Sequence, residues 1–159
     1  MPIDSQSVKT TEQGGVKGFD AGKKVKGRKR HLVVDTLGLL LKGVVHSAAI
    51  QDPVGAKAVL GPMARSFPRL HKIWADTIYR GSLVTWVWLC FGWILEIVKR
   101  DAHRKGFHVQ HWRWIVERTF AWLGRYRRLS KDYEFQTKTS ETMIYMAMSF
   151  LMVHRLAHS

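Results

Sequence analysis

The chain has 159 residues, of which 46% are hydrophobic and 24% are charged. This size and composition are typical of one folded unit, so we expect residues 1–159 to form a single domain. The 7 Trp, 7 Phe and 4 Tyr residues supply apolar area that disordered basic tails lack, which excludes a largely disordered chain. Lys and Arg number 26 against 12 Asp and Glu, a formal net charge of +14. Such an excess predicts a polyanionic partner.

Cysteine usage and hydropathy predict the compartment. The lone Cys90 cannot form an internal disulfide, so nothing in the sequence requires an oxidising environment. The first residues show no basic stretch followed by an apolar one, and therefore no signal peptide. The longest uncharged run, from Gly81 to Leu95, is shorter than the roughly 20 residues that cross a bilayer. We expect a cytoplasmic protein without a membrane partner.

Hydrophobic periodicity and turn-forming residues predict the elements of the first half of the chain. Asp35-Thr36-Leu37-Gly38 separates two β-rich apolar runs, which is typical of a hairpin. In chain order we expect a short strand at Ile3, a loop over 10–17, hairpin strands over 31–34 and 39–45, a helix from 52 to about 67 and a strand over 72–75.

The second half of the chain is expected to be mostly helical. The segment from Ser82 to Gly92 is apolar on nearly every side, so we expect a buried helix there. A strand over 93–98 and a polar connection to about His111 should follow. Two longer helices are expected after them, one over 112–127 and a core helix that begins at Ser140. The whole order predicts a mixed α/β fold.

Three carboxylates stand out from the other acidic residues. Asp4 follows a short apolar start, Asp76 ends a predicted strand, and Glu117 projects from a predicted helix away from its apolar side. If the two strands are neighbours, their carboxyl ends place Asp4 and Asp76 together, and the helix could add Glu117. Such a cluster would bind hard Mg²⁺, although three ordinary surface carboxylates remain the alternative from spacing alone.

Several longer segments resemble the DDE-type transposases of bacterial insertion sequences. The similarity covers nearly the whole chain, including Trp74-Ala75-Asp76 and Tyr133-Glu134. Its most specific parts are the runs over 4–10, 20–31 and 114–128.

The resemblance implies a ribonuclease H-like fold, similar to that of retroviral integrases, with a mixed sheet flanked by helices. It also implies that Asp4, Asp76 and Glu117 are both the catalytic and the metal-binding residues, holding two Mg²⁺ ions for which Mn²⁺ can substitute. Such transposases nick DNA at element ends and use the freed 3′ hydroxyl to attack target DNA. The implied partners are element-end and target DNA and further copies of the same chain, in a bacterial cytoplasm and on the nucleoid when DNA is bound.

Some positions depart from the family pattern. Gln110 stands where relatives carry Tyr, and Gly124 stands where they carry Lys, with Arg125 beside it as a substitute. Thr77 and Ile78 replace two glycines that many relatives carry after the second Asp.

The start of the chain also departs from the pattern. Relatives usually have an upstream helical DNA-binding region, whereas Asp4 lies only three residues from the start here. We therefore expect this region to be absent, either because the frame is the second of two joined by frameshifting, which makes an upstream reading-frame product a partner, or because the copy is truncated.

Two basic segments are predicted to contact DNA phosphates rather than to form a solvated face. The residues concerned are Lys23, Lys24, Lys26, Arg28, Lys29 and Arg30 in the first segment, and Arg113, Arg118, Arg125, Arg127 and Arg128 in the second. The tryptophans in apolar runs, such as Trp88 and Trp93, are expected in the core.

Three functions are consistent with these features. The first is a metal-dependent DNA strand transferase, the second is an inactive or truncated transposase remnant that only binds DNA, and the third is a noncatalytic RNA-binding protein. Only the first requires the acidic triad.

Overall fold

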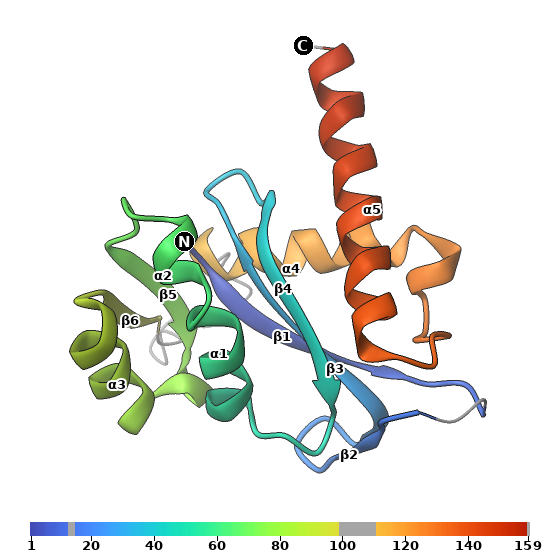
Figure 1. Cartoon of the computed structure of the whole chain (residues 1–159), viewed down its shortest axis with the longest axis horizontal. Helices are drawn as coiled ribbons and strands as arrows, with labels where there is room; N and C mark the ends of the chain where they lie inside the picture. The colour runs from blue at the N-terminus through green and yellow to red at the C-terminus, as the bar shows by residue number, and fades with distance from the viewer. Residues whose placement is uncertain (13–14, 99–110, 159) are drawn as a thin grey trace, which may run out of the picture.

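The computed structural model describes residues 1–12, 15–98 and 111–158, in which strands and helices alternate along the chain (Figure 1). The elements are β1 (Ile3–Lys9), β2 (Gly18–Asp20), β3 (Val25–Val34), β4 (Leu40–Ser47), α1 (Asp52–Leu60), α2 (Met63–Ser66), β5 (Lys72–Asp76), the 3-10 turn η1 (Thr77–Tyr79), α3 (Ser82–Phe91), β6 (Ile94–Val98), α4 (His111–Gly124), the 3-10 turn η2 (Arg127–Leu129) and α5 (Thr137–Ala157). The predicted mixed α/β fold is confirmed.

The strands form two sheets that meet at the start of β1. Strand β3 lies between β1 and β4, pairs antiparallel with both, and also pairs with the short β2. Strands β5 and β6 pair in parallel. A parallel bridge between Pro2 and Trp74 connects the two sheets, and the Trp74 amide donates to the Met1 carbonyl at 3.0 Å. The strands therefore follow one another across the molecule in the order β4, β3, β1, β5, β6.

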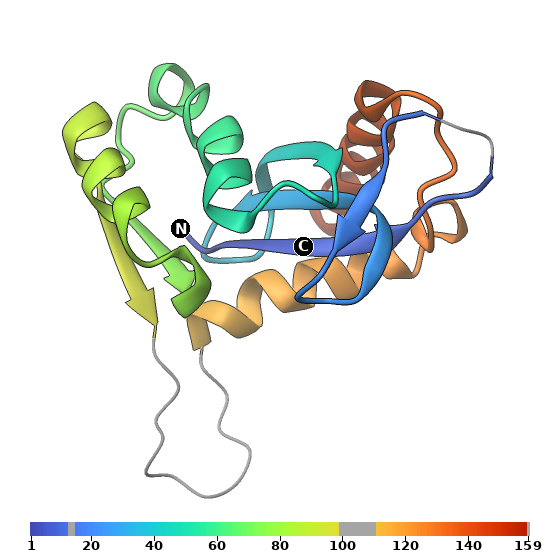
Figure 2. The same cartoon turned by 90° about the horizontal axis from the view of Figure 1, so that it is seen from below.

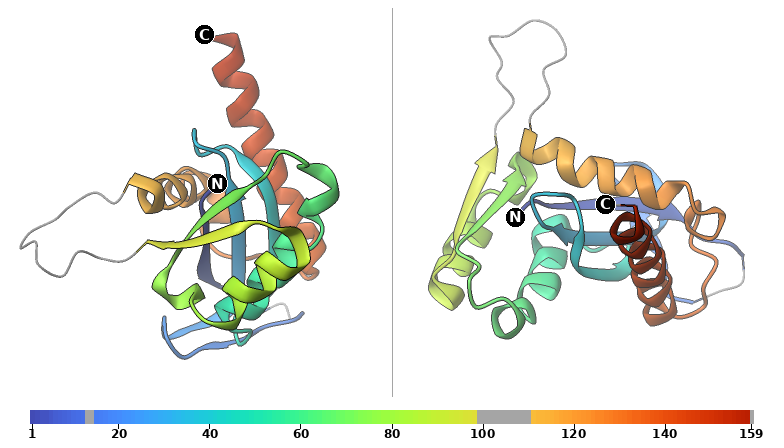
Figure 3. Two further views of the ribbon diagram at one scale, coloured as in Figure 1. Left: turned by 90° about the vertical axis from the view of Figure 1, so that its left-hand side faces the viewer. Right: turned by 90° about the horizontal axis from the view of Figure 1, so that it is seen from above.

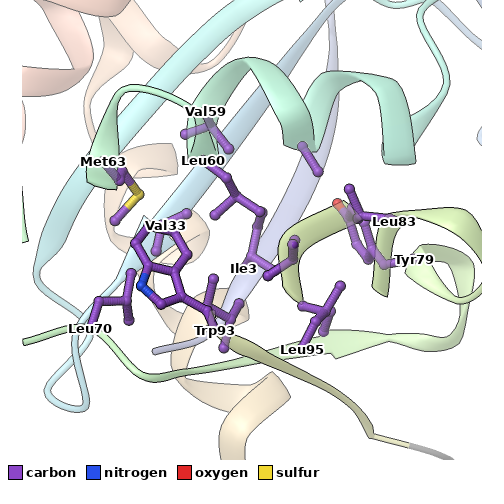
Figure 4. Packing of buried hydrophobic residues seen from close by; sticks show 14 residues of the cluster. Ile3, Val33, Val59, Leu60, Met63, Leu70, Tyr79, Leu83, Trp93 and Leu95 are labelled. Atoms are coloured by element: carbon purple, nitrogen blue, oxygen red, sulfur yellow. The ribbon is translucent and has the colours of Figure 1, made fainter. Parts of the chain in front are cut away.

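Alternating side chains of the strands supply two separate hydrophobic cores. Val33 belongs to the core beneath α1, α2 and α3, whereas its neighbours Leu32 and Val34 belong to the core beneath α4 and α5. Figure 2 shows α1 and α4 on opposite sides of the central strands. The first core is the larger, and in it the ring of Trp93 packs with Leu70 and Met63 among aliphatic side chains (Figure 4).

Several predicted elements are confirmed, with shifted ends. The hairpin is present, although its first strand begins at Val25 and thus includes most of the predicted basic cluster. The strand at Ile3 continues to Lys9, so Asp4 lies near the start of a strand and not at its carboxyl end. The predicted connection over 99–110 lies outside the described residues.

The helix predicted after Ser82 is confirmed as α3, but the expectation that it is buried is wrong. Only Leu83 and Val87 of α3 are buried, while Trp88 and Leu89 are 58% and 75% exposed. The reason is position, because α3 lies at one end of the molecule, where β6 covers a single side of it (Figure 3). The expectation that both Trp88 and Trp93 are core residues therefore holds only for Trp93.

The prediction for the last helix is only partly correct. Helix α5 begins at Thr137, three residues before the predicted start, and its buried side chains end at Met148. Beyond that point the helix extends past the rest of the molecule, and Phe150 and Leu156 are 65% and 78% exposed (Figure 1). Within the described parts of the chain, we find no helix with the length and apolar character needed to cross a bilayer.

The structure also corrects the prediction that Arg28, Lys29 and Arg30 contact DNA, because all three side chains are buried in β3. Arg28 forms an ion pair with Asp132 at 3.0 Å and donates to the carbonyls of residues 16, 134 and 135. Lys29 lies 3.0 and 2.9 Å from the carboxylates of residues 20 and 52, and Arg30 donates to the carbonyls of residues 129 and 131. These cations hold the fold together and are not exposed to phosphate.

Replacing Asp132 by Ala should therefore destabilise the fold strongly, since it leaves the Arg28 guanidinium buried without its counter-ion. We expect the free energy of unfolding to fall by about 3 to 5 kcal/mol. Glu134→Ala is the matched control, because Glu134 pairs with the side chain of Arg128, which is 62% exposed. Loss of this ion pair should lower the free energy of unfolding by less than about 1 kcal/mol. Urea unfolding measures the free energy of unfolding of both variants. Equal losses for the two variants would contradict the structural role of the buried pair.

Candidate active site

The alternation of side chains along β1 and β5 directs two carboxylates toward α4. Ile3 and Ala75 belong to the core on the α1 side of the sheet, so the next residues, Asp4 and Asp76, lie on the opposite face. The Pro2–Trp74 bridge sets β1 and β5 in parallel register and brings these two residues side by side. Both line one small pocket.

Helix α4 closes this pocket. The ring of Trp112 stacks on the ring of Trp74, with 3.8 Å between the centroids and 1° between the planes, and Val116 also lines the pocket. This contact fixes the first turns of α4 against β5. Arg113 then lies beside the two aspartates, and Glu117 follows it four residues later on the helix.

Arg113 connects the carboxylates. Its guanidinium lies 3.1 Å from Asp76 and 3.5 Å from Glu117, and it lines the same pocket as Asp4. The exposed fraction rises outward, from 19% for the Arg113 side chain to 28% for Asp76 and 53% for Glu117. The structure thus gathers Asp4, Asp76 and Glu117 around one positive charge.

Local hydrogen bonds orient the two aspartates. One oxygen of Asp76 accepts from the Thr77 amide and from its hydroxyl at 3.0 Å, while its other oxygen faces Arg113. Thr77 therefore holds Asp76 in place as the cap of η1. An oxygen of Asp4 accepts from the Ser5 amide at 2.8 Å.

The Asp4 carboxyl has an unusual proton affinity. Its pKa is raised from 3.8 to about 6, chiefly by burial and also by the charge of Asp76, against the opposing effects of the Ser5 amide, Lys23 and Arg113. The Ser5 amide, Lys23 and Arg113 therefore compensate only part of the cost of burying the negative charge of Asp4. An added cation would stabilise its charged form.

The chemistry of these side chains fits a divalent cation, but their described arrangement is not a formed metal centre. Carboxylate oxygens are the ligands that Mg²⁺ prefers. Among the described residues, however, no three His, Cys, Asp or Glu side chains stand close enough to one another to hold a metal ion. The Arg113 guanidinium lies between Asp76 and Glu117 instead.

Comparison with known families identifies the family of this chain. One family model, described as the transposase DDE domain, matches residues 1–152. The chain belongs to this family. The predicted resemblance to DDE-type insertion-sequence transposases is therefore confirmed. Searches of curated proteins and of solved structures returned no match.

The remaining basic residues of this transposase DDE domain differ in their environments. Lys24, Lys26, Arg125 and Arg127 are exposed. Lys23 donates to the carbonyl and the hydroxyl of Ser5, both at 2.7 Å. Arg128 pairs with Glu134 at 2.8 Å and Arg113 pairs with the candidate carboxylates, while Arg118 packs between two tryptophan rings. Gln110, the departure predicted before α4, lies outside the described residues.

Sequence analysis missed a set of buried acids in the transposase DDE domain. Asp20, Asp52, Asp132 and Glu141 are at most 9% exposed. Three of them balance the cations of β3, and Glu141 accepts from the Val45 amide at 3.0 Å. One feature of the sequence could have indicated these buried acids. The basic cluster continues without a break into Leu32, Val33 and Val34, and such a continuous apolar run is typical of a strand covered on both faces.

The pH dependence of stability provides a test of the Asp4 environment. The pKa of Asp4 is higher in the folded chain, so between about pH 4 and 6 the folded state binds more protons and its stability falls as the pH rises. In an Asp4→Asn variant the side chain cannot ionise, but it keeps an oxygen that accepts from the Ser5 amide. We therefore expect Asp4→Asn to match the wild type near pH 4 and to be more stable at pH 7, by up to about 3 kcal/mol.

Urea unfolding at both pH values measures this difference. A variant that is less stable than the wild type at pH 7 would contradict a buried, weakly balanced Asp4.

Proposed function

We propose that this chain is the catalytic part of an insertion-sequence transposase, which nicks DNA at element ends and joins the freed 3′ hydroxyl to target DNA. Family membership supports transposition as the process. The observation that carries the chemical assignment is the gathering of Asp4, Asp76 and Glu117 around Arg113. These three carboxylates are proposed as the catalytic and metal-binding residues.

The strand arrangement supports a ribonuclease H-like fold for this domain. Three antiparallel strands, β4, β3 and β1, are followed across the sheet by the parallel pair β5 and β6, and α4 packs along β1, β3 and β5. In this fold the candidate acids come from the first strand, from the neighbouring parallel strand and from a helix across them. Asp4, Asp76 and Glu117 occupy those places.

We propose that the three carboxylates hold Mg²⁺, two ions in the active complex, with Mn²⁺ as a substitute. Bound there, the ions would stabilise the attacking and leaving oxygens of an in-line phosphoryl transfer. Arg113 pairs with both Asp76 and Glu117 and compensates part of their charge. When the carboxylates hold a metal, this guanidinium is free to pair with a DNA phosphate, for which its planar fork is well suited.

Exposed cations around the site would bind the DNA backbone. Lys24 and Lys26 lie near the β2–β3 turn, and Arg125, Arg127 and Arg128 follow the end of α4. Each phosphate that they neutralise makes the affinity more dependent on salt. DNA, further copies of this chain and an upstream reading-frame product are the proposed partners, in a bacterial cytoplasm and at the nucleoid.

One observation favours a second function, that of a remnant that binds DNA without cutting it. Arg113 occupies the space between Asp76 and Glu117, and a cation must displace it before both carboxylates can act as ligands. If this ion pair is permanent, the basic surface still binds DNA while the chemistry is lost.

Nicking of supercoiled plasmid distinguishes the two functions. We expect the full chain at low salt to convert supercoiled plasmid to nicked circles with Mg²⁺ or Mn²⁺ and not with EDTA. Glu117→Gln should lose the activity by at least about 100-fold, because it removes a charged ligand. Glu12→Gln is the control for the same chemical change, since Glu12 is exposed in the loop after β1; its activity should equal that of the wild type.

Nicking that is unaffected by Glu117→Gln would contradict the assignment of the site. Retained DNA binding without nicking by the wild-type chain would reject catalysis by this chain alone and favour the remnant.

A further inference from the structure

Two adjacent lysines of the basic cluster differ in their contacts. The Nζ of Lys23 donates to both the carbonyl and the hydroxyl of Ser5 at 2.7 Å, although the residue as a whole is exposed. Lys24, the next residue, is also exposed, and within the described part of the chain its side chain forms no hydrogen bond or ion pair. Lys23 is therefore attached to β1, whereas the charge of Lys24 is available to a partner.

The turn between β2 and β3 gives the Lys23 side chain a defined starting point. The Lys23 amide donates to the Asp20 carboxylate at 3.1 Å, and Lys24 has a φ of +53°, a conformation that residues other than glycine adopt mainly in tight turns. Asp20 is itself held by the Ser7 hydroxyl at 2.6 Å and by Lys29 at 3.0 Å. The turn that carries Lys23 is thus anchored to buried groups.

Ser5, the residue that Lys23 contacts, is held from several directions. It is 6% exposed, and its hydroxyl donates to Asp52 at 2.8 Å. Lys29 lies 2.9 Å from the same Asp52 oxygen. Lys23 adds two hydrogen bonds to this network, so both the hydroxyl and the carbonyl of Ser5 have fixed partners.

The constraint on Ser5 reaches Asp4 through the backbone. The Ser5 amide donates to the Asp4 carboxylate at 2.8 Å, so any movement of Ser5 changes how that carboxylate is oriented. The charge of Lys23 also acts on Asp4, because Lys23 and Arg113 both oppose the rise of the Asp4 pKa. Lys23 therefore supports Asp4 by geometry and by charge.

The two cations near Asp4 differ in what a bound metal ion would require of them. Arg113 pairs with Asp76 and Glu117, which are proposed metal ligands. Lys23 forms no ion pair with a carboxylate among the described residues, and its hydrogen bonds go to Ser5 alone. A cation at the candidate site would compete with Arg113 for its partners and would not compete with Lys23.

We propose that Lys23 is a positioning residue for the proposed reaction, which acts through Ser5 to hold the Asp4 carboxylate on the α4 side of β1. In this role Lys23 does not contact a DNA phosphate, whereas Lys24 does. The inference rests on the proposed function, and it separates Lys23 from the other basic residues that were predicted to contact DNA.

Matched lysine variants test this role in the nicking of supercoiled plasmid. With the full chain in excess and Mg²⁺ present, the experiment gives the nicking rate at saturation and the chain concentration at half that rate. Lys23→Met should lower the saturated rate by about 10-fold to 100-fold, since small displacements of a catalytic group have effects of this size. Its half-saturating concentration should stay within about twofold of the wild type, because no phosphate contact is lost.

Lys24→Met makes the same chemical change at the neighbouring residue and should have the opposite effect. Its half-saturating concentration should rise severalfold, while the saturated rate stays close to that of the wild type. Lys23→Arg keeps the charge and the donors, and it should recover part of the rate that Lys23→Met loses.

The salt dependence of DNA binding gives a readout that needs no catalysis. Lys24→Met should reduce the slope of log Kd against log salt concentration by about 1, the effect of one lost phosphate contact. Lys23→Met should leave that slope unchanged.

A double variant tests whether Lys23 acts through Ser5. Ser5→Ala removes the hydroxyl that accepts from Lys23. If the two residues act as one unit, the rate loss of the double variant is smaller than the product of the two single losses.

Four results would overturn the proposal. They are an unchanged saturated rate in Lys23→Met, a reduced salt slope in that variant, single losses that multiply in the double variant, and a Lys23→Met chain that is unfolded at the assay temperature, which would make Lys23 merely structural. In each case the proposed function survives if nicking by the wild type still requires Glu117. A wild-type chain that binds DNA without nicking it would instead reject the proposed function, and the positioning role with it.

Discussion

The pairing of β1 with β3 is the constraint on which the other features depend. In this register Asp4 lies opposite Leu32 and faces α4, while Ser5 lies opposite His31 and donates to Asp52 at 2.8 Å on the α1 side. A slip of one residue would exchange the two faces and remove Asp4 from the pocket. The same alternation in β5 places Asp76 beside it. The candidate site is therefore a consequence of sheet register, completed by the stacking of Trp112 on Trp74.

The large positive charge of the chain has two separate roles. In β3, Arg28 and Lys29 are buried and balanced by acids that come from distant parts of the sequence, so part of the net charge stabilises the fold. On α4, Arg113 pairs with Asp76 and Glu117, whereas Arg118 stacks with tryptophan and forms no ion pair with a carboxylate among the described residues. The net charge predicted a polyanionic partner, but only the cations that are not buried can contact such a partner. The exposed ones are Lys24 and Lys26 near the β2–β3 turn, and Arg125 and Arg127 after the end of α4.

The sequence predicted the elements well where periodicity or turn residues were clear, as in the hairpin around Asp35 and in α4. It also led to Asp4, Asp76 and Glu117 through motif resemblance. It could not show that Arg28 and Arg30 are buried, because their partners in the Leu129–Asp132 segment are about 100 residues away and only the folded chain brings them together. It likewise could not show that α3 is covered on one side only, since hydrophobicity does not reveal what packs against a helix. Long-range contacts account for both errors.

Metal binding tests the central claim most directly, namely that carboxylates from two strands and a helix form one cation site. Titration of the full chain with Mn²⁺, followed by the electron paramagnetic resonance signal of the free ion, counts bound ions without requiring catalysis. We predict saturable binding by the wild type, loss of that binding in Asp76→Asn, and no change in Asp35→Asn, whose carboxylate accepts from amides of its own turn. Equal Mn²⁺ binding by the wild type and Asp76→Asn would contradict the claim.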